Sequence, residues 1–172
     1  LALNLKETGN VVPSSEDYVK RWEGPPDSGP LSGAAKNLAQ TYQAVWEQSQ
    51  FSVLEKSHNR GCQIYAPEGK VIYGRDQLIE FLTGYTKSFL KGSYRVHHWI
   101  VNEEEGKNTR IALRWSFSAE HTGFGSFGEP TGAPVVIMAI THAEMQEDLV
   151  VREYHAIDEI LLWMQISRNS MS

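Results

Sequence analysis

Two of the six histidines, His121 and His142, are the leading candidates for acid–base chemistry in this sequence. They lie in the segment SAEHTGFGSFGEPTGAPVVIMAITHAEM, which runs from Ser118 to Met145. Histidine exchanges protons near neutral pH, so it is a natural general acid or base. The stretch between the two histidines is rich in Gly and Pro, which is typical of a loop. They are therefore either working groups at the rim of a pocket or polar residues on ordinary strands.

The residues around His121 alternate in polarity, which predicts a strand over residues 109–121. One face would carry Ile111, Leu113, Trp115, Phe117, Ala119 and His121, and the other Arg110, Arg114, Ser116, Ser118 and Glu120. The first face would look into a pocket, and the second suits solvent or a subunit interface. His142 lies beside Thr141 on the next predicted strand, where neighbours face opposite sides unless a bulge intervenes. The pattern leaves the face of His142 open.

Other reactive residue types give weaker signals. Cys62 is the single cysteine, so no disulfide can form within the chain, and its setting favours a structural thiol. No pair of histidines has metal-ligand spacing, so no metal site is predicted. A phosphate site would need a helix after the Gly-rich loop, but a strand follows it. The loop is therefore interpreted as the flexible edge of a pocket, with Phe124 and Phe127 as lid residues. Asp158 fits a helix N-cap.

Helices and strands must position these candidates. Apolar residues recur at helical spacing over residues 34–48, 51–58 and 75–90, and a last helix is predicted over residues 158–166. A turn at residues 67–69 joins two short strands, and longer strands are predicted over 94–102, 109–121, 133–146 and 149–158. Helices followed by antiparallel hairpins indicate the α+β class. A curved sheet with helices across one face would leave a space for a small ligand.

Length and composition limit the class of protein. The chain has 172 residues and a net charge of −5, which is enough for one full domain and argues against nucleic-acid binding. No apolar run approaches the ~18 residues of a membrane span, and no signal peptide is recognisable, so a cytoplasmic protein without membrane contact is expected. Residues 1–33 are predicted to form an arm or linker, with a short helix that carries Tyr18 and Trp22, and residues 34–172 the domain.

Four segments then suggest a family. They are YQAVWEQSQFSVLEKSH, YGRDQLIEFL, EHTGFGSFGEPTGAPV and VVREYHAIDEILLWMQI, and the match that they carry covers about Ala34 to Ile166. This pattern resembles the SnoaL-like polyketide cyclase branch of the nuclear transport factor 2-like superfamily. The final part is most similar to the second half of bacterial proteins that carry two such domains in tandem. Residues 1–33 would then correspond to the linker between the domains.

The resemblance implies a cone-shaped α+β roll of the nuclear transport factor 2-like or cystatin-like type, with a pocket between sheet and helices. It also implies homodimers that pair sheet to sheet. Members of the family close rings by an intramolecular aldol reaction, and relatives isomerise ketosteroids or open epoxides. None of these reactions needs a metal or an organic cofactor, so neither is expected here. The same fold also serves as a binding or assembly module.

The sequence departs from the family at one position, because the aspartate that acts as acid and base in the cyclases falls on Thr141. Threonine does not titrate near neutral pH. The resulting hypothesis is a cyclase, isomerase or lyase acting on a cyclic or polyketide-like carbonyl compound. The candidate catalytic residues are His121, His142 and Thr141, and the candidate substrate-binding residues are Trp115, Phe117, Tyr154, Trp46, Phe124, Phe127 and Asp158. A non-catalytic ligand-binding domain and a pairing domain remain the alternatives.

Overall fold

The computed structural model describes residues 30, 31 and 33–169. The helices are α2 (Gly33–Gln48), η2 (Phe51–Val53), α3 (Leu54–Ser57), η3 (Pro67–Gly69), α4 (Gly74–Ser88) and α5 (Glu159–Asn169). The strands are β1 (His58–Tyr65), β2 (Val71–Tyr73), β3 (Phe89–Asn102), β4 (Thr109–His121), β5 (Pro134–Gln146) and β6 (Leu149–Ile157). The helix predicted around Tyr18 and Trp22 lies outside the described residues. None of the described helices is long and apolar enough to cross a membrane.

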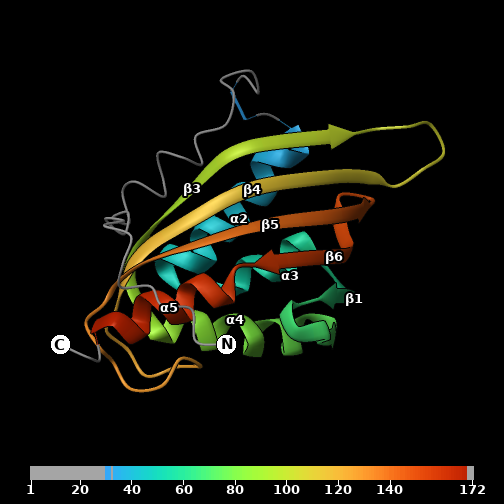
Figure 1. Ribbon diagram of the computed structural model, residues 1–172. Coiled ribbons are helices and arrows are strands. Elements are labelled where there is room, and N and C mark those ends of the chain that lie inside the picture. Colours follow the sequence, from blue (N-terminus) through green and yellow to red (C-terminus); the bar gives the residue numbers. More distant parts are fainter. Residues whose placement is uncertain (1–29, 32, 170–172) are drawn as a thin grey trace, which may run out of the picture.

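Six strands form one curved sheet in the order β2-β1-β6-β5-β4-β3. The sheet arches over α2, α3 and α4, while α5 lies near the end at which β6 finishes (Figure 1). All neighbouring strands are antiparallel except β1 and β6, which run parallel. The predicted α+β class is confirmed. The parallel pair was not predicted, because it joins strands that are distant in the sequence.

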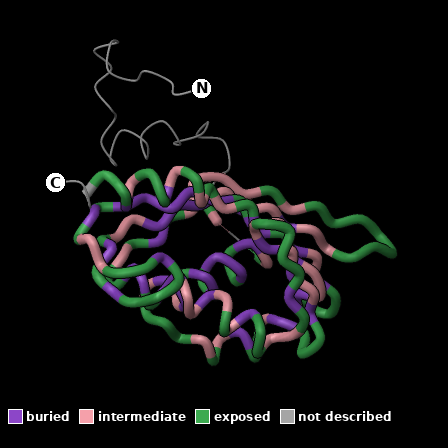
Figure 2. Tube along the Cα trace, turned by 60° about the horizontal axis from the view of Figure 1, so that its bottom comes forward, coloured by how far each residue is buried: buried purple, intermediate pink, exposed green. Residues whose placement is uncertain are grey.

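The core lies between the helices and the concave face of the sheet. On α2 the buried side chains recur at helical spacing, as in Leu38, Tyr42 and Trp46. They meet the alternating residues of β4, of which Trp115 and Phe117 are essentially inaccessible. The inward face predicted for residues 109–121 is therefore confirmed. Figure 2 shows buried segments on both layers, whereas the hairpin between β3 and β4 projects from the body of the molecule and is exposed.

A bulge in β6 decides which residues of that strand face the core. The turn at Glu147 and Asp148 has positive φ at both residues (48° and 62°), as a tight two-residue hairpin requires. Met145 pairs with Val150, but Glu144 already pairs with Arg152, so one extra residue is inserted in β6. The β6 residues after this bulge therefore point to the opposite face of the sheet from the one they would take in a regular hairpin.

Glu153 is buried as a result, and Tyr154 is 40% exposed on the outer face. Tyr154, a predicted substrate-binding residue, therefore points away from the interior of the cone. A regular hairpin would have placed Tyr154 opposite Thr141, whereas the bulge puts His155 there. A second local difference concerns His58, which was expected at the end of a helix and is the first residue of β1.

Candidate functional site

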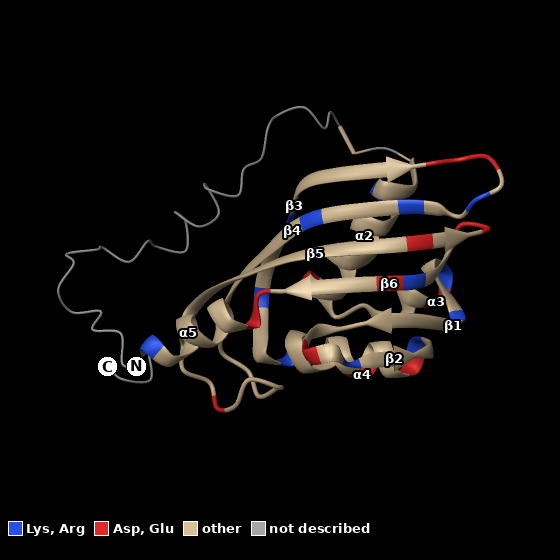
Figure 3. Ribbon diagram, turned by 45° about the vertical axis from the view of Figure 1, so that its right-hand side comes forward, with Lys and Arg blue, Asp and Glu red and all other residues tan. Residues whose placement is uncertain are grey.

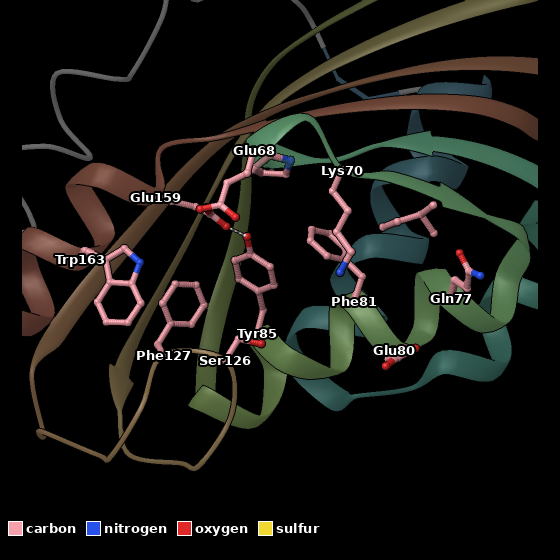
Figure 4. Close-up of a pocket in the computed structure, with 12 residues that line it drawn as sticks. Glu68, Lys70, Gln77, Glu80, Phe81, Tyr85, Ser126, Phe127, Glu159 and Trp163 are labelled. Atoms are coloured by element: carbon pink, nitrogen blue, oxygen red, sulfur yellow. Dashed lines mark hydrogen bonds between the residues drawn. The ribbon is translucent and has the colours of Figure 1, made fainter.

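A hollow of about 540 Å³ opens between η3, α4, α5 and the loop that joins β4 to β5. Figure 4 shows its side chains, which come from these four segments and from Lys70 and Ile72 at the start of β2. The residues that line it are Pro67, Glu68, Lys70, Ile72, Gln77, Glu80, Phe81, Tyr85, Ser126, Phe127, Glu159 and Trp163. We call it the α4–α5 pocket. Its size is within the range of pockets that bind small organic molecules.

One wall of the α4–α5 pocket is a row of aromatic rings. The ring centroids of Phe81 and Tyr85 are 5.2 Å apart, those of Tyr85 and Phe127 5.1 Å, and those of Phe127 and Trp163 5.2 Å. Rings at these separations pack against one another and present a broad apolar surface. Such a wall suits a flat, ring-containing ligand.

At the floor of the pocket, the Tyr85 hydroxyl donates a hydrogen bond to Glu159 Oε1. Tyr85 is only 2% exposed. Burial, and then the hydrogen bond to Glu159, raise the pKa of Tyr85 far above its ordinary value, so the phenol keeps its proton. Glu159 belongs to the first turn of α5, where the positive end of the helix dipole favours a negative charge. The floor thus combines a protonated donor with a carboxylate.

Asp158 immediately precedes this carboxylate and is exposed. Its Oδ1 accepts a hydrogen bond from the backbone N–H of Leu161 at 2.9 Å, so it caps α5. Asp158 does not line the α4–α5 pocket. The cap fixes where α5 begins, and it thereby positions Glu159 over Tyr85.

Thr141 belongs to a different group of polar residues, which is buried inside the cone and which we call the buried cluster. Its members are Tyr42, His58, Thr141, Glu153 and His155, and each is at most 6% exposed. Glu153 Oε2 lies 2.5 Å from the Tyr42 hydroxyl oxygen, 3.3 Å from His58 Nε2 and 3.0 Å from His155 Nε2. None of these residues lines the α4–α5 pocket.

The two ring nitrogens of His58 contact Ser57 on one side and Glu153 on the other. The Ser57 hydroxyl donates to the Val53 carbonyl at 3.0 Å, so its oxygen must accept from His58 Nδ1 at 2.8 Å. A neutral His58 would then turn a bare Nε2 toward the Glu153 carboxylate, which also only accepts. The contacts of the two ring nitrogens therefore suit a His58 that donates both to Ser57 and to Glu153.

The same reasoning applies to His155. Trp115 Nε1 can only donate, and it donates to Thr141 Oγ1 at 2.9 Å. The Thr141 hydroxyl is left to donate to His155 Nδ1 at 3.1 Å. His155 consequently carries its proton on Nε2, which points at Glu153. His58 and His155 thus both direct Nε2 at the same carboxylate oxygen.

These donors keep Glu153 ionised. Burial by itself would raise the pKa of Glu153, but the charge of His58 and the hydrogen bonds from His155 and His58 outweigh it and lower the pKa well below its usual range. The other oxygen, Oε1, has no hydrogen-bond partner among the described residues. The buried cluster is therefore an ionised network that depends on the fold around it.

The space in front of Thr141 is filled by side chains that were predicted to bind substrate. The Trp115 ring lies 5.1 Å from that of Trp46, and the Trp46 ring lies 5.1 Å from that of Phe117. All three residues are at most 3% exposed. In this structure they act as core residues, and they separate Thr141 from the α4–α5 pocket.

His121 faces inward, as the alternation predicts, but it lies apart from Thr141 and from the pocket. Its Nδ1 is 3.2 Å from Thr131 Oγ1, while its Nε2 has no hydrogen-bond partner among the described residues. Burial lowers the pKa of His121 below its ordinary value of 6.5, so it prefers the neutral form. Phe89 packs against His121 on one side and Phe127 on the other.

His142 lies on the outer face of the sheet. Its ring stacks on that of Tyr154 with centroids 5.9 Å apart, and Tyr154 stacks on Tyr65 at 4.7 Å. The structure therefore does not bring His121, Thr141 and His142 together. Of the two predicted lid residues, Phe127 is 5% exposed and lines the pocket, whereas Phe124 is 75% exposed.

Several residues of the two polar sites were not predicted, namely Tyr85, Glu159, Trp163, Glu153 and His155. The spacing of Phe81 and Tyr85 on one helical face was visible, but their partner on α5 was not. For the buried cluster, the signal was the pair of titratable residues on either side of Tyr154. Among the described residues, no group of three or more His, Cys, Asp or Glu side chains is arranged to hold a metal ion.

The fold and the α4–α5 pocket define a class of α+β proteins in which a curved sheet wraps around helices beside a small-molecule pocket. A sequence model of one family, described as SnoaL-like polyketide cyclase, matches residues 36–166. The chain belongs to this family, and the predicted resemblance is confirmed. A comparison with curated protein sequences gives no match.

Solved structures support the same fold. A protein from Acidithiobacillus ferrooxidans, described as a polyketide cyclase, matches with a TM-score of 0.67 and 13% identity over 81% of this chain and 99% of its own. A SnoaL-like protein from Jannaschia sp. CCS1 matches with a TM-score of 0.62 and 15% identity over 80% and 96%. AclR from Streptomyces galilaeus, described as a hydroxylase, has a TM-score of 0.62 and 22% identity over 79% and 83%. At these identities the likeness shows the fold, and the expected cone-shaped roll is confirmed.

Proposed function

We propose that this chain is an enzyme that transfers protons on a cyclic or polyketide-like carbonyl compound bound in the α4–α5 pocket. One observation carries the proposal: the buried Tyr85 hydroxyl and the Glu159 carboxylate form a hydrogen-bonded pair at the floor of an aromatic-walled hollow. Family membership is consistent with this reaction class, because the family model is that of polyketide cyclases. The proposed chemistry is located differently from the family's position at Thr141.

The pair fits the geometry of enol formation. A carbonyl oxygen and the hydrogen on its α-carbon are close neighbours, so a donor for the oxygen and a base for the hydrogen must also be close neighbours. Tyr85 and Glu159 meet this requirement because they are in hydrogen-bond contact when no ligand separates them. Pre-positioned donors of this kind stabilise the charge that develops on oxygen.

The reaction proceeds in two steps. Glu159 removes the α-proton, the electrons of the C–H bond form the C=C bond, and the carbonyl oxygen becomes an enolate that accepts the Tyr85 hydrogen bond. In an isomerase, the Glu159 carboxylic acid returns the proton to another carbon. In a cyclase, the enolate carbon attacks a second carbonyl of the same molecule, and Glu159 protonates the new alkoxide. Neither route consumes a co-reactant.

A non-catalytic binding domain is the second candidate. It is favoured by Thr141, the residue at the family's acid–base position, because threonine cannot act as that acid or base. Its hydroxyl is also occupied, since it accepts from Trp115 and donates to His155. In that case the α4–α5 pocket would hold its ligand without chemistry.

Hydrogen–deuterium exchange at the α-carbon separates the two candidates without knowledge of the natural substrate. A tetralone, a bicyclic aryl ketone, would be incubated with the protein in D₂O and followed by proton NMR. We expect the protein to accelerate exchange, and Glu159→Gln to slow the accelerated rate about 10²- to 10⁴-fold because it removes the base. Tyr85→Phe removes the oxyanion donor and keeps the ring packing, so it should also slow exchange.

Glu55→Gln is the matched control, because Glu55 also lies in the first turn of a helix but is exposed on α3 and outside the pocket. It should leave the rate unchanged. Equal rates for Glu159→Gln and the unmodified chain would refute the catalytic proposal. Binding of the ketone without acceleration of exchange would favour the binding domain.

A further inference from the structure

The α4–α5 pocket carries an excess of negative charge. Its lining includes three glutamates, Glu68, Glu80 and Glu159, and one lysine, Lys70. The ion pairs found among the described residues involve other carboxylates, those of Glu104, Glu144 and Glu153. The three pocket glutamates are therefore not neutralised by a described side chain, and the pocket retains a negative field.

Two of these carboxylates converge on one spot. Figure 4 shows the Glu68 and Glu159 side chains approaching the Tyr85 hydroxyl from η3 and from the start of α5. Both charges add to burial in raising the pKa of Tyr85, which places Glu68 electrostatically close to the pair. Glu68 adopts a left-handed backbone conformation (φ 62°) within η3, and this conformation directs the chain at the pocket rim. Like charges this close favour a positive charge between them.

The single lysine of the pocket is positioned elsewhere. Lys70 Nζ lies 5.8 Å from the centroid of the Phe81 ring, at the end of the aromatic row opposite Trp163. It serves as a cation–π partner for Phe81. Among the described residues that line the pocket, none in the half formed by Glu68, Glu159 and Trp163 is a cation.

That same half contains the aromatic surface best suited to a cation. Trp163 is 46% exposed, and its ring packs against Phe127 at 5.2 Å. Tryptophan is the strongest of the aromatic side chains in binding ammonium groups. Exposed tryptophan and converging carboxylates are separate observations, and both indicate the same ligand chemistry.

We propose that the ligand of the α4–α5 pocket is an organic cation, a flat ring system that bears a protonated amine. The rings lie along Phe127 and Trp163, and the ammonium group lies between Glu68 and the Trp163 face. This inference names the substrate class for the site of the proposed function and rests on that site being the ligand pocket. Carboxylated or phosphorylated ring compounds are excluded by repulsion from the three glutamates.

A set of three probes with the same ring tests this inference by isothermal titration calorimetry. The probes are naphthylethylamine, naphthylethanol and naphthylacetate, which carry a positive, a zero and a negative charge at neutral pH. We expect the amine to bind roughly tenfold more tightly than the alcohol, with the acetate weakest, because a cation between a carboxylate and an aromatic face is stabilised to about this extent. Added salt should reduce the preference, because salt screens charges at the rim.

Two variants divide the effect into its parts. Glu68→Gln should remove most of the preference for the amine and leave the affinity for the alcohol unchanged. Trp163→Leu should weaken the binding of all three probes, because the ring wall is shortened. Glu55→Gln, which lies outside the pocket, should change nothing.

Equal affinities for the amine and the alcohol would overturn the inference. A preference for the amine that persists in Glu68→Gln would also overturn it, because the charge would then be read elsewhere. None of the probes is a ketone or an aldehyde, so these results are independent of the exchange experiment. If the unmodified chain did not accelerate exchange but still preferred the amine, the catalysis would be refuted and the ligand class would stand.

Discussion

At the scale of single residues, Thr141 shows how a side chain that does not titrate is tied into a buried network of titratable ones. Thr141 is buried and uses its hydroxyl as a donor to His155, which lies opposite on β6. His155 in turn donates to Glu153, and His58 completes the pairing. Acid–base groups are thus present near Thr141, but they belong to neighbouring strands and are buried in the core, where Trp115 donates to Thr141.

The pKa of Glu153 leads to a prediction about stability. Glu153 is more acidic in the folded chain than its ordinary value of 4.5, so the unfolded chain binds more protons once the pH falls below about that value. The contribution of Glu153 to stability is therefore complete above this pH and is lost as the pH falls further. At neutral pH, Glu153→Gln should lower the free energy of unfolding by about 3–5 kcal/mol, because it removes the carboxylate from the buried pair with His58.

Urea unfolding at neutral pH would measure this difference, and its acid dependence would be measured near pH 5.5 and near pH 3, both below the ordinary histidine pKa of about 6.5. The gap between the unmodified chain and Glu153→Gln should narrow on acidification. The groups that face Glu153 are Tyr42 on α2, His58 on β1 and His155 on β6. Glu144→Gln is the control, because Glu144 pairs with a partly exposed Arg152 and should cost less than about 1 kcal/mol. A gap that widens in acid would contradict the assignment.

At the scale of elements, the loop between β4 and β5 is held against α4 by close backbone contacts. Gly123 N–H donates to the Ser88 carbonyl at 3.1 Å, and Ser126 N–H donates to the Gly84 carbonyl at 3.0 Å. A side chain at Gly125 would place its Cβ 2.2 Å from the Gly84 carbonyl oxygen, so only glycine allows this approach. The docked loop delivers Phe127 to the pocket wall.

Gly125→Ala should therefore displace the loop and withdraw Phe127 from its contacts with Tyr85 and Trp163. We expect a loss of about 1–3 kcal/mol in the free energy of unfolding, the usual cost of overpacking, and faster amide exchange in residues 122–133. Hydrogen-exchange mass spectrometry would measure the second effect. Gly61→Ala is the control, because its Cβ would approach only the Asn59 side chain, at 3.8 Å. Unchanged exchange in the loop would show that the docking contact is not needed.

At the scale of the whole molecule, the outer face of the sheet carries apolar side chains among charged ones. Ile100 is 56% exposed and Ile140 is 45% exposed, and Tyr154 lies near Ile140 on the adjoining strand. Figure 3 shows arginine segments on β4 and β6 and an acidic segment on β5, so the strands of this face carry both signs of charge. A mixed surface of this kind is typical of an interface.

We expect the chain to form a homodimer through this face. Ile140→Glu would place a buried charge at the interface and should convert the dimer to a monomer, whereas Ile160→Glu, on the exposed side of α5, should not. Size-exclusion chromatography with light scattering measures the mass of each variant. A monomer of the unmodified chain at high concentration would rule out the pairing.

The sequence by itself determined the features that depend on neighbours along the chain. The helical stripe of α2 and the alternating face of β4 follow from the periods of 3.6 and 2, and the Asp158 cap follows from a local hydrogen bond. The family was also predictable, because its motifs are continuous segments. These features need no knowledge of what lies across the molecule.

Only the tertiary structure decided which polar residues meet. Tyr85 and Glu159 are 74 positions apart and touch because the Asp158 cap starts α5 above α4. Glu153 faces inward because one extra residue in β6 reverses the faces of the strand. Both outcomes depend on pairing between distant segments, and a shift of a single residue in register exchanges the buried face of a strand with the exposed one. Periodicity along the chain therefore predicts the faces of each element, but their register decides which side chains form a site.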